Sequence, residues 1–199
     1  MQKLLLASNN SGKLLEIRSL LKDLPIVLVT PSDLGIALQV SEDGCTYQEN
    51  AEKKSIQYAR KSGLISLADD TGLEVDALDG KPGIHSARIT TEIEATDADR
   101  RNYLLDLLKD YPPPWTAQFK CTVAIAIPSE KTYFFEGTCN GEIIPQEKGR
   151  HGFGYDPIFF LPELNKTMAQ LSLSEKNEIS HRAAAINSAR TTILDLLKR

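Results

Sequence analysis

Residues 4–21 read LLLASNNSGKLLEIRSLL, and this stretch indicates the fold class. It begins with a four-residue apolar run, Leu4–Ala7, which is typical of a buried strand. A polar turn is expected at residues 8–12, where asparagine and glycine favour a change of direction. Apolar residues then recur with helical spacing at Leu14, Ile17 and Leu21. A strand, a turn and an amphipathic helix in this order are typical of α/β folds.

The same alternation continues along the chain. Residues 26–29 form a second apolar run, and Thr30-Pro31 is typical of a helix start. Thr46 and Glu49 have the spacing of a capping box, which predicts a helix to about Lys61. An apolar strand is expected at residues 64–68, before the polar sequence Asp69-Asp70-Thr71-Gly72.

The second half of the chain predicts a different arrangement. A capping box at Thr96-Asp97-Ala98-Asp99 predicts a helix through Leu108, and Pro112-Pro113-Pro114 breaks it. We place a boundary between two parts of the molecule near residues 112–115. Residues 117–127 and 132–135 are rich in strand formers and read as paired antiparallel strands. Together with a C-terminal amphipathic helix, these patterns predict an α/β fold with a mixed sheet.

Composition restricts the partners. The 199 residues include 23 Lys and Arg and 27 Asp and Glu, a formal net charge of −4. No global basic field exists for a nucleic-acid polymer, so phosphate must meet a local cation cluster. The three cysteines form no C-x-x-C pair, which favours a reducing compartment over zinc or disulfides. No apolar stretch approaches the ~20 residues of a membrane span, and we expect a cytoplasmic protein.

The turn at residues 8–13 is the first candidate site. A strand-to-helix turn presents free backbone N–H groups and the positive end of the helix dipole, which suits phosphate. Lys13 adds a positive charge. A plain turn with Asn10 or Ser11 as the helix cap explains the sequence equally well. The stretch is not a P-loop, because the first glycine of that motif is absent and Leu14 replaces its hydroxyl residue.

The paired carboxylates at Asp69 and Asp70 are the second candidate. Loops at the carboxyl ends of strands are common ligand positions in open α/β sheets. Neighbouring strand side chains point to opposite faces, so one ligand should not meet both carboxylates equally. One could hold Mg²⁺ or activate water while the other braces the loop. A solvated, aspartate-rich turn is the simpler interpretation.

Three further groups of residues could bind a nucleotide, and each also has a purely structural interpretation. Asn50 and Lys54 share a helix face, and Glu42 upstream is either a loop charge or a magnesium ligand. The loop 149–157 has glycines around two aromatics, which could stack a base or plug the core. The sequence Ser180-His181-Arg182 places cations in the first turn of the last helix, against its dipole.

The ordered set of motifs closely resembles the inosine triphosphate pyrophosphatase family, whose members hydrolyse nonstandard purine nucleoside triphosphates. The matching blocks span nearly the whole chain in family order, so together they are far more specific than any single motif. They are residues 6–13 with Glu16, 47–51, 68–78, 82–88, 152–159, and Lys176 with Ser180-His181-Arg182.

The resemblance implies a fold and a reaction. It implies one domain over residues 1–199, with an elongated mixed sheet flanked by helices and two lobes around a central cleft. It also implies a homodimer. Family members cleave ITP, dITP and XTP between the α- and β-phosphates, giving the monophosphate and pyrophosphate, and they use Mg²⁺.

The resemblance also implies residue roles. Asp70 is the expected base that accepts a proton from water, and Asp70 and Glu42 are the expected metal ligands. Phe153 should stack on the base, and Thr71 takes a substrate-contacting position. The residues expected at the phosphates are Ser8, Asn10, Lys13, Lys54 and Lys176, and those expected at the base edge are Asp156, His181 and Arg182. Asn9, Ser11, Gly12, Gly154 and Tyr155 complete the expected substrate-binding set.

Two other functions compete with this prediction. A nucleotide-binding module without catalysis would use the same lysines and aromatics, although the paired aspartates argue against it. A phosphatase would release the γ-phosphate instead. A donor-lined pocket with Arg182 would reject adenine, since its 6-amino group is a donor, by ~10⁴-fold or more. Guanine shares the 6-oxo group, so its exclusion must depend on packing around C2.

Overall fold

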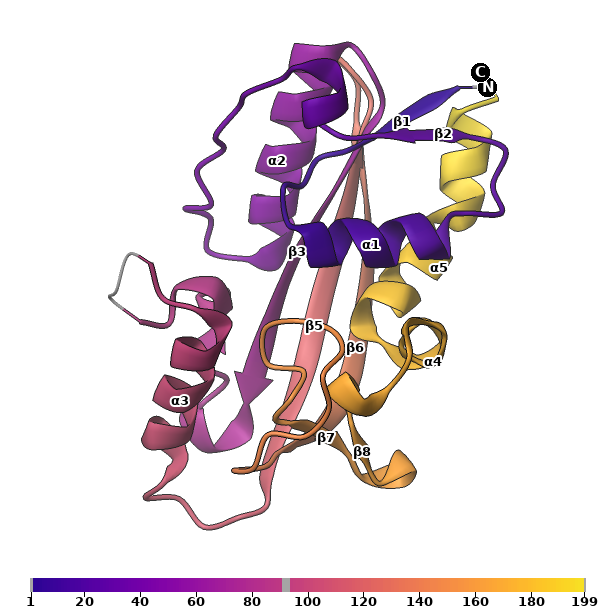
Figure 1. The fold of residues 1–199 in the computed structure, drawn as a ribbon. Helices are drawn as coiled ribbons and strands as arrows, with labels where there is room; N and C mark the ends of the chain where they lie inside the picture. Colours follow the sequence, from indigo (N-terminus) through magenta and orange to yellow (C-terminus); the bar gives the residue numbers. More distant parts are fainter. Residues whose placement is uncertain (1, 91–93, 199) are drawn as a thin grey trace. The chain divides into compact units, whose positions relative to one another are not determined.

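The computed structural model describes residues 2–90 and 94–198 (Figure 1). The chain divides into two compact units. Unit 1 contains residues 1–70, 121–137 and 181–199, and unit 2 contains residues 71–120 and 138–180. The boundary expected near residues 112–115 does not fall there, because this segment lies inside unit 2. The chain changes units within three strands, β3, β5 and β6, and once more between Ser180 and His181.

The described residues form an eight-stranded sheet in the order β2-β1-β3-β5-β6-β7-β8, with β4 paired to β3. Strand β1 is parallel to β2 and β3, whereas β3–β4, β6–β7 and β7–β8 are antiparallel. The predicted α/β class with a mixed sheet is therefore confirmed. The strands are β1 (Lys3–Leu6), β2 (Val27–Val29), β3 (Ser66–Val75), β4 (Pro82–Gly83), β5 (Trp115–Ala126), β6 (Thr132–Ile143), β7 (Phe159–Leu161) and β8 (Lys166–Thr167).

Two helices, α2 and α3, begin where their capping residues predicted them. Thr46 accepts a hydrogen bond from the Glu49 N–H at 3.1 Å, and the Glu49 carboxylate accepts from the Cys45 N–H at 2.7 Å. Thr96 and Asp99 form the complete reciprocal capping box. The α-helices are α1 (Ser11–Leu20), α2 (Tyr47–Ser62), α3 (Asp97–Leu108), α4 (Leu173–Ile179) and α5 (His181–Leu196).

Two local predictions were wrong. Thr30-Pro31 is followed only by a short 3₁₀ turn, Ser32–Leu34, in which Asp33 accepts a hydrogen bond from the Thr30 N–H at 2.8 Å. The expected turn at Asp69-Asp70-Thr71-Gly72 is instead the middle of β3. The backbone stays extended there because buried cationic and amide partners, described below, take the place of water around the two carboxylates.

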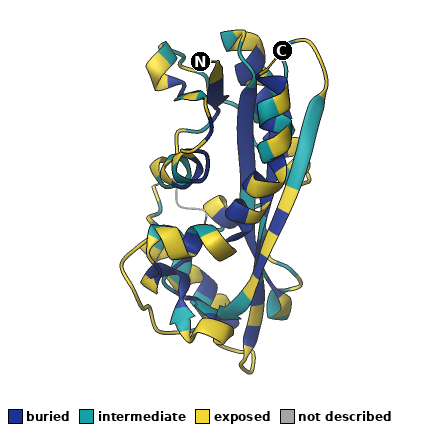
Figure 2. Ribbon diagram, turned by 90° about the vertical axis from the view of Figure 1, so that its right-hand side faces the viewer, coloured by how far each residue is buried: buried dark blue, intermediate teal, exposed yellow. Residues whose placement is uncertain are grey.

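Unit 1 has a layered core whose faces follow the strand alternation. Leu4 and Leu6 of β1 pack in the cluster that includes α1 and α5 residues. Leu5 and Ala7 belong to a separate cluster with Tyr58 of α2. Helix α5 carries both buried and exposed residues along its length, as Figure 2 shows. Side chains of β3 therefore point either to the α1–α5 side of the sheet or to the α2 side.

Unit 2 has its own apolar cluster. Leu104 and Leu108 of α3 are fully buried in it, with Leu73 and Val75 from the second half of β3. The rings of Phe119 and Phe159 lie with centroids 4.4 Å apart in the same cluster. Within the described part of the chain, no helix has the length and apolar character needed to cross a membrane.

Candidate functional site

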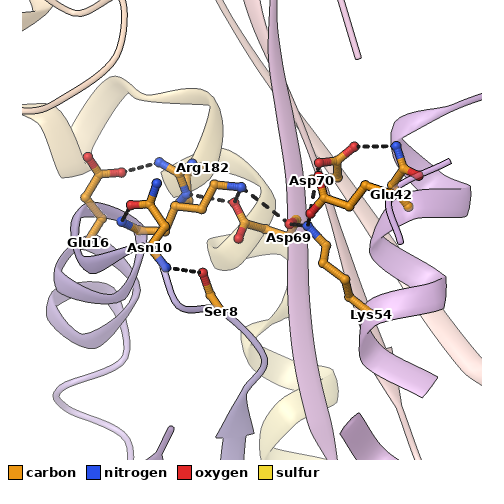
Figure 3. Close-up of polar contacts among 10 residues, drawn as sticks. Ser8, Asn10, Glu16, Glu42, Lys54, Asp69, Asp70 and Arg182 are labelled. Atoms are coloured by element: carbon orange, nitrogen blue, oxygen red, sulfur yellow. Dashed lines mark hydrogen bonds and ion pairs between the residues drawn. The ribbon is translucent and has the colours of Figure 1, made fainter. Parts of the chain in front are cut away.

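Asp69 and Asp70 lie in the middle of β3, just beyond the point where β1 ends (Figure 3). The register pairs Leu6 of β1 with Leu67 of β3, so the two aspartates follow the carboxyl end of β1. Alternation sends their side chains to opposite faces, and the contacts agree. Asp69 meets residues of α1 and α5, whereas Asp70 meets residues of α2.

The Asp69 carboxylate is buried among cations. Its side chain is 1% exposed, and its Oδ2 lies 3.1 Å from Lys13 Nζ and 3.1 Å from Arg182 Nε. Burial alone would raise the pKa of Asp69, but Lys13, Arg182 and Lys54 outweigh it and hold that pKa well below its usual range. Asp69 is therefore ionised at neutral pH and neutralises part of this cation cluster.

The Asp70 carboxylate has a different environment. Its Oδ2 accepts a hydrogen bond from Asn50 Nδ2 at 3.2 Å, and its Oδ1 lies 3.6 Å from Lys54 Nζ. Burial raises the pKa of Asp70, Lys54 and Lys13 oppose this effect, and Glu42 adds to it. Adjacent carboxylates with pKa values shifted in opposite directions are typical of divided acid–base roles.

The two lysines approach one backbone oxygen. Lys54 Nζ donates to the Asp69 carbonyl at 2.6 Å, and Lys13 Nζ lies 3.4 Å from the same oxygen. Lys54 also pairs with Glu42 Oε1 at 2.9 Å. Burial opposes its charge, but Asp70, Asp69 and Glu42 together raise the pKa of Lys54. The structure thus places two ammonium groups at the strand that carries both aspartates, an arrangement suited to a polyanion.

The turn between β1 and α1 lies beside this cluster. Asn10 caps α1 by accepting a hydrogen bond from the Lys13 N–H at 3.0 Å, and its own N–H donates to Ser8 Oγ at 3.2 Å. Capping therefore accounts for Asn10, as one of the two sequence interpretations expected. Asn9 and Ser11 are exposed, Gly12 is half-buried, and the phosphate roles of this turn stay predictions.

The carboxylates suit a magnesium ion that also binds the substrate. Over residues 2–90 and 94–198, no group of three or more metal-ligating side chains is present. Mg²⁺ does not require such a cage, because it is commonly held by one or two carboxylates, substrate phosphates and water. Glu42 Oε1 and Asp70 Oδ1 lie 2.9 Å and 3.6 Å from the same ammonium, Lys54 Nζ, so two carboxylates already converge on one cation here. The donor set therefore fits Mg²⁺.

In unit 2, Asp156 organises the loop between β6 and β7. Its Oδ2 accepts from the Phe153 N–H at 2.9 Å and forms a buried ion pair with Lys176 Nζ. The same ammonium lies 5.2 Å from the centroid of the Phe153 ring. Gly152 has φ 74, and a Cβ there would lie 1.9 Å from Asp156 Oδ2. Phe153, Asp156 and Lys176 thus form one local group.

Two of the expected substrate residues have buried ion-pair partners. Lys176, expected at the phosphates, pairs with Asp156 and lies over the Phe153 ring, and its phosphate role stays a prediction. Arg182 was expected at the base edge, but it is 1% exposed and pairs with Glu16 and Asp69. Its contact with a base stays a prediction. His181 is also buried, at the start of α5.

The remaining expected residues lie beside these groups. Thr71 follows Asp70 in β3 and is half-buried, and Gly154 and Tyr155 follow Phe153 in its loop. Tyr155 is buried, and its hydroxyl donates to the Ser86 carbonyl at 2.8 Å, so it acts as a support of the loop.

Glu16 belongs to this cluster although it was not among the expected site residues. It lies between the apolar positions of α1, is 3% exposed and pairs with Arg182. Burial of an acidic residue needs a cationic partner, and that partner lies at the other end of the chain. Its presence in the family-like block was the only available signal.

Comparisons with known proteins agree over nearly the whole chain. The model of the Ham1 family matches residues 4–192. A Geobacter sulfurreducens protein named dITP/XTP pyrophosphatase is 45% identical over 186 residues, which cover 94% of each chain. A protein of the same name from Listeria monocytogenes is 41% identical over 200 residues, covering 100% of this chain and 98% of its own.

Solved structures are similar as well. The Staphylococcus aureus Ham1 protein matches with a TM-score of 0.84 and 41% identity, over 96% of this chain and 98% of its own. A HAM1 protein from Coxiella burnetii matches with a TM-score of 0.88 and 37% identity, over 98% of this chain and 100% of its own.

Proposed function

Since this chain belongs to the Ham1 family, we propose that it hydrolyses nonstandard purine nucleoside triphosphates, namely ITP, dITP and XTP, to the monophosphate and pyrophosphate. The observation that carries the proposal is the division of Asp69 and Asp70. The Asp69 carboxylate is buried between Lys13 and Arg182, whereas the Asp70 carboxylate lies on the other face beside Lys54 and Asn50. We also propose that residues 1–199 form one pyrophosphatase domain, because β3, β5 and β6 each contribute to both units.

Asp70 is the proposed general base. Its carboxylate accepts a proton from a water molecule, whose oxygen forms a bond to the α-phosphorus while the bond to the bridging oxygen breaks. Pyrophosphate leaves with the electron pair of that bond. Asn50 holds Asp70 Oδ2 in place, so the carboxylate that accepts the proton has a fixed orientation.

Unit 1 supplies the proposed phosphate contacts. Lys13 and Lys54, which both lie at the Asp69 carbonyl, would pair with phosphoryl oxygens, and the turn at residues 8–12 would donate backbone N–H groups. Asp70 and Glu42 are the proposed magnesium ligands. The ion, when bound, neutralises phosphate charge. Because the protein is acidic overall, these local cations must supply the attraction for a triphosphate.

The proposed base contacts come from Phe153, with Asp156, His181 and Arg182 at the base edge and Thr71 near the substrate. Lys176, which pairs with Asp156 and lies over the Phe153 ring, is proposed as a further phosphate contact. We further propose a homodimer in the cytoplasm. The three cysteines are free thiols, which suits a reducing compartment.

The test is turnover of ITP, XTP, GTP and ATP with Mg²⁺, with pyrophosphate and orthophosphate measured separately. We expect pyrophosphate from ITP and XTP, with little turnover of ATP or GTP, and none of this activity when Mg²⁺ is chelated. Asp70→Asn should lower kcat by about 10²- to 10⁴-fold while substrate binding persists. The exposed Asp195→Asn serves as the control for an aspartate-to-asparagine change.

Three outcomes would contradict the proposal. Orthophosphate as the product would move cleavage to the γ-phosphate, and tight ITP binding without product would favour a binding module. Equal turnover of GTP and ITP would exclude the proposed selection around C2. A monomeric mass measured by light scattering would contradict only the proposed homodimer and would leave the proposed reaction unaffected.

A further inference from the structure

The loop that carries Phe153 needs support from outside itself. It has no regular secondary structure, and glycines at positions 152 and 154 have φ values of 74 and 61. Glycine gives a chain the widest conformational freedom, so the backbone conformation at these two positions depends on the contacts that hold it.

Helix α3 holds both peptide groups of Gly154. Asp97 Oδ2 accepts a hydrogen bond from the Gly154 N–H at 2.7 Å. Arg101 Nη1 donates to the Gly154 carbonyl at 2.8 Å. Asp97 and Arg101 are four residues apart and therefore share one face of α3. The bonded N–H belongs to the peptide that joins Phe153 to Gly154, so the plane directly after Phe153 is fixed from α3.

Each of these side chains is itself held in place. Arg101 forms a bidentate ion pair with Glu147, with Nε 2.7 Å from Oε1 and Nη2 3.0 Å from Oε2. Asp97 Oδ1 accepts from Arg100 Nη1 at 2.7 Å, and Arg100 Nε donates to the Ala87 carbonyl at 2.9 Å. A planar guanidinium with a paired carboxylate restricts the direction of its remaining N–H groups.

The geometry points to Asp97 and Arg101 as positioning residues that hold the Phe153 loop in the conformation needed to bind the purine base. This inference rests on the proposed function. Neither side chain needs to touch the substrate, because both act through the backbone of Gly154. The loop also has the Phe153 N–H bond to Asp156, so the two peptide groups on either side of Phe153 have defined partners.

The packing of unit 2 makes this role separable from folding. Helix α3 is anchored by the fully buried Leu104 and Leu108, and its first turn by the Thr96–Asp99 capping box. Removal of the Asp97 carboxylate leaves those contacts intact. It removes the Arg100 ion pair and the hydrogen bond from the Gly154 N–H, and loss of the second is expected to weaken ITP binding by about 10- to 100-fold.

The experiment measures KM and kcat for ITP, together with inhibition by pyrophosphate, for Asp97→Ala, Asp97→Asn and Arg101→Lys. Pyrophosphate lacks a base, so its binding should not depend on the Phe153 loop. We expect Asp97→Ala to raise KM for ITP by about tenfold or more with a small change in kcat, and to leave the pyrophosphate inhibition constant within about twofold. Asp97→Asn keeps an oxygen acceptor for the Gly154 N–H and should retain most of the affinity.

Arg101→Lys and Asp106→Asn complete the design. Lysine cannot form a bidentate ion pair with Glu147 and also reach the Gly154 carbonyl. Arg101→Lys should therefore raise KM for ITP as Asp97→Ala does. Asp106 is exposed on the same helix, and Asp106→Asn should match the unmodified protein. If Asp97→Ala leaves KM unchanged, or weakens ITP and pyrophosphate equally, the positioning role is wrong. If the unmodified protein releases no pyrophosphate from ITP, the proposed function fails instead.

Discussion

Asp69 and Asp70 are consecutive residues of β3, yet Asp69 pairs with Arg182 at 3.1 Å on one face of the sheet and Asp70 accepts from Asn50 at 3.2 Å on the other. Strand alternation produces this separation, and the neighbouring helices supply opposite surroundings. Asp69 is surrounded by cations and has a lowered pKa, whereas burial raises the pKa of Asp70. One dipeptide therefore provides a fixed negative charge and a separate, more basic carboxylate.

Asp69→Asn should destabilise the fold. Asparagine has nearly the same size but no charge, so the change leaves Lys13 and the fully buried Arg182 without their shared carboxylate. Loss of one partner from a buried ion pair costs about 3–5 kcal/mol in the free energy of unfolding. Urea denaturation at neutral pH measures this loss.

The control for that change is an exposed aspartate. Asp195 lies 3.8 Å from Lys198, and both side chains are more than half exposed. Asp195→Asn should therefore change the free energy of unfolding by less than about 0.5 kcal/mol. A comparably small effect of Asp69→Asn would mean that the charge of Asp69 does not stabilise its cationic neighbours.

Local sequence signals were enough to predict most of the elements. Capping residues and apolar periodicity located α1, α2, α3 and α5, because both signals depend on residues close in sequence. The polar segment 69–72 was misread as a turn, because exposed aspartate and glycine usually end strands. It stays in β3 because its partners come from α1, α2 and α5, and no local pattern encodes those contacts.

The sequence predicted which residue types form the candidate site, but not which side chains form ion pairs with one another. Lysines, aspartates and the aromatic loop were recognised as residue types that suit a nucleotide. The Glu16–Arg182 pair joins residues 166 positions apart, so neither helical spacing nor charge pattern could reveal it. The same holds for Lys176, whose buried partner Asp156 places it beside Phe153.

Phe153→Ala should weaken binding of ITP. The half-buried ring is the proposed stacking surface for the purine, and stacking on an aromatic side chain contributes about 1–3 kcal/mol per base. KM for ITP should rise by about 5- to 150-fold, and Phe153→Tyr should preserve most of the affinity because it keeps the ring. Steady-state kinetics measure both variants.

A second phenylalanine serves as the control that distinguishes loss of base stacking from loss of packing in the fold. Phe134 is a half-buried phenylalanine of β6, and Phe134→Ala should leave KM for ITP near that of the unmodified protein. If Phe134→Ala raises KM as much as Phe153→Ala does, the effect reports packing and not base binding.

The three cysteines should differ in reactivity toward a thiol reagent. Cys45 is exposed, whereas Cys121 and Cys139 are buried. Burial raises the pKa of Cys121 to about 12 and that of Cys139 to about 11, so neither forms the reactive thiolate near neutral pH. The folded protein should react at one thiol, and the urea-unfolded protein at three. Cys45→Ser should abolish the reaction in the folded state, and residual labelling of that variant would contradict the burial of the other two.

Gly152→Ala should disrupt the Phe153 loop far more than a glycine change elsewhere. At Gly152 the added Cβ would lie 1.9 Å from Asp156 Oδ2, the atom that binds both Lys176 and the Phe153 N–H. The variant should lose about 3 kcal/mol or more in the free energy of unfolding, because the buried Asp156–Lys176 pair must separate. It should also raise KM for ITP.

Gly35→Ala is the matched control, since Gly35 has a similar φ of 64 but nothing within 4 Å of its added Cβ. Gly35→Ala should lose only the backbone strain of about 1–2 kcal/mol in the free energy of unfolding. Equal losses in the two variants would show that the contact with Asp156 does not contribute to the destabilisation.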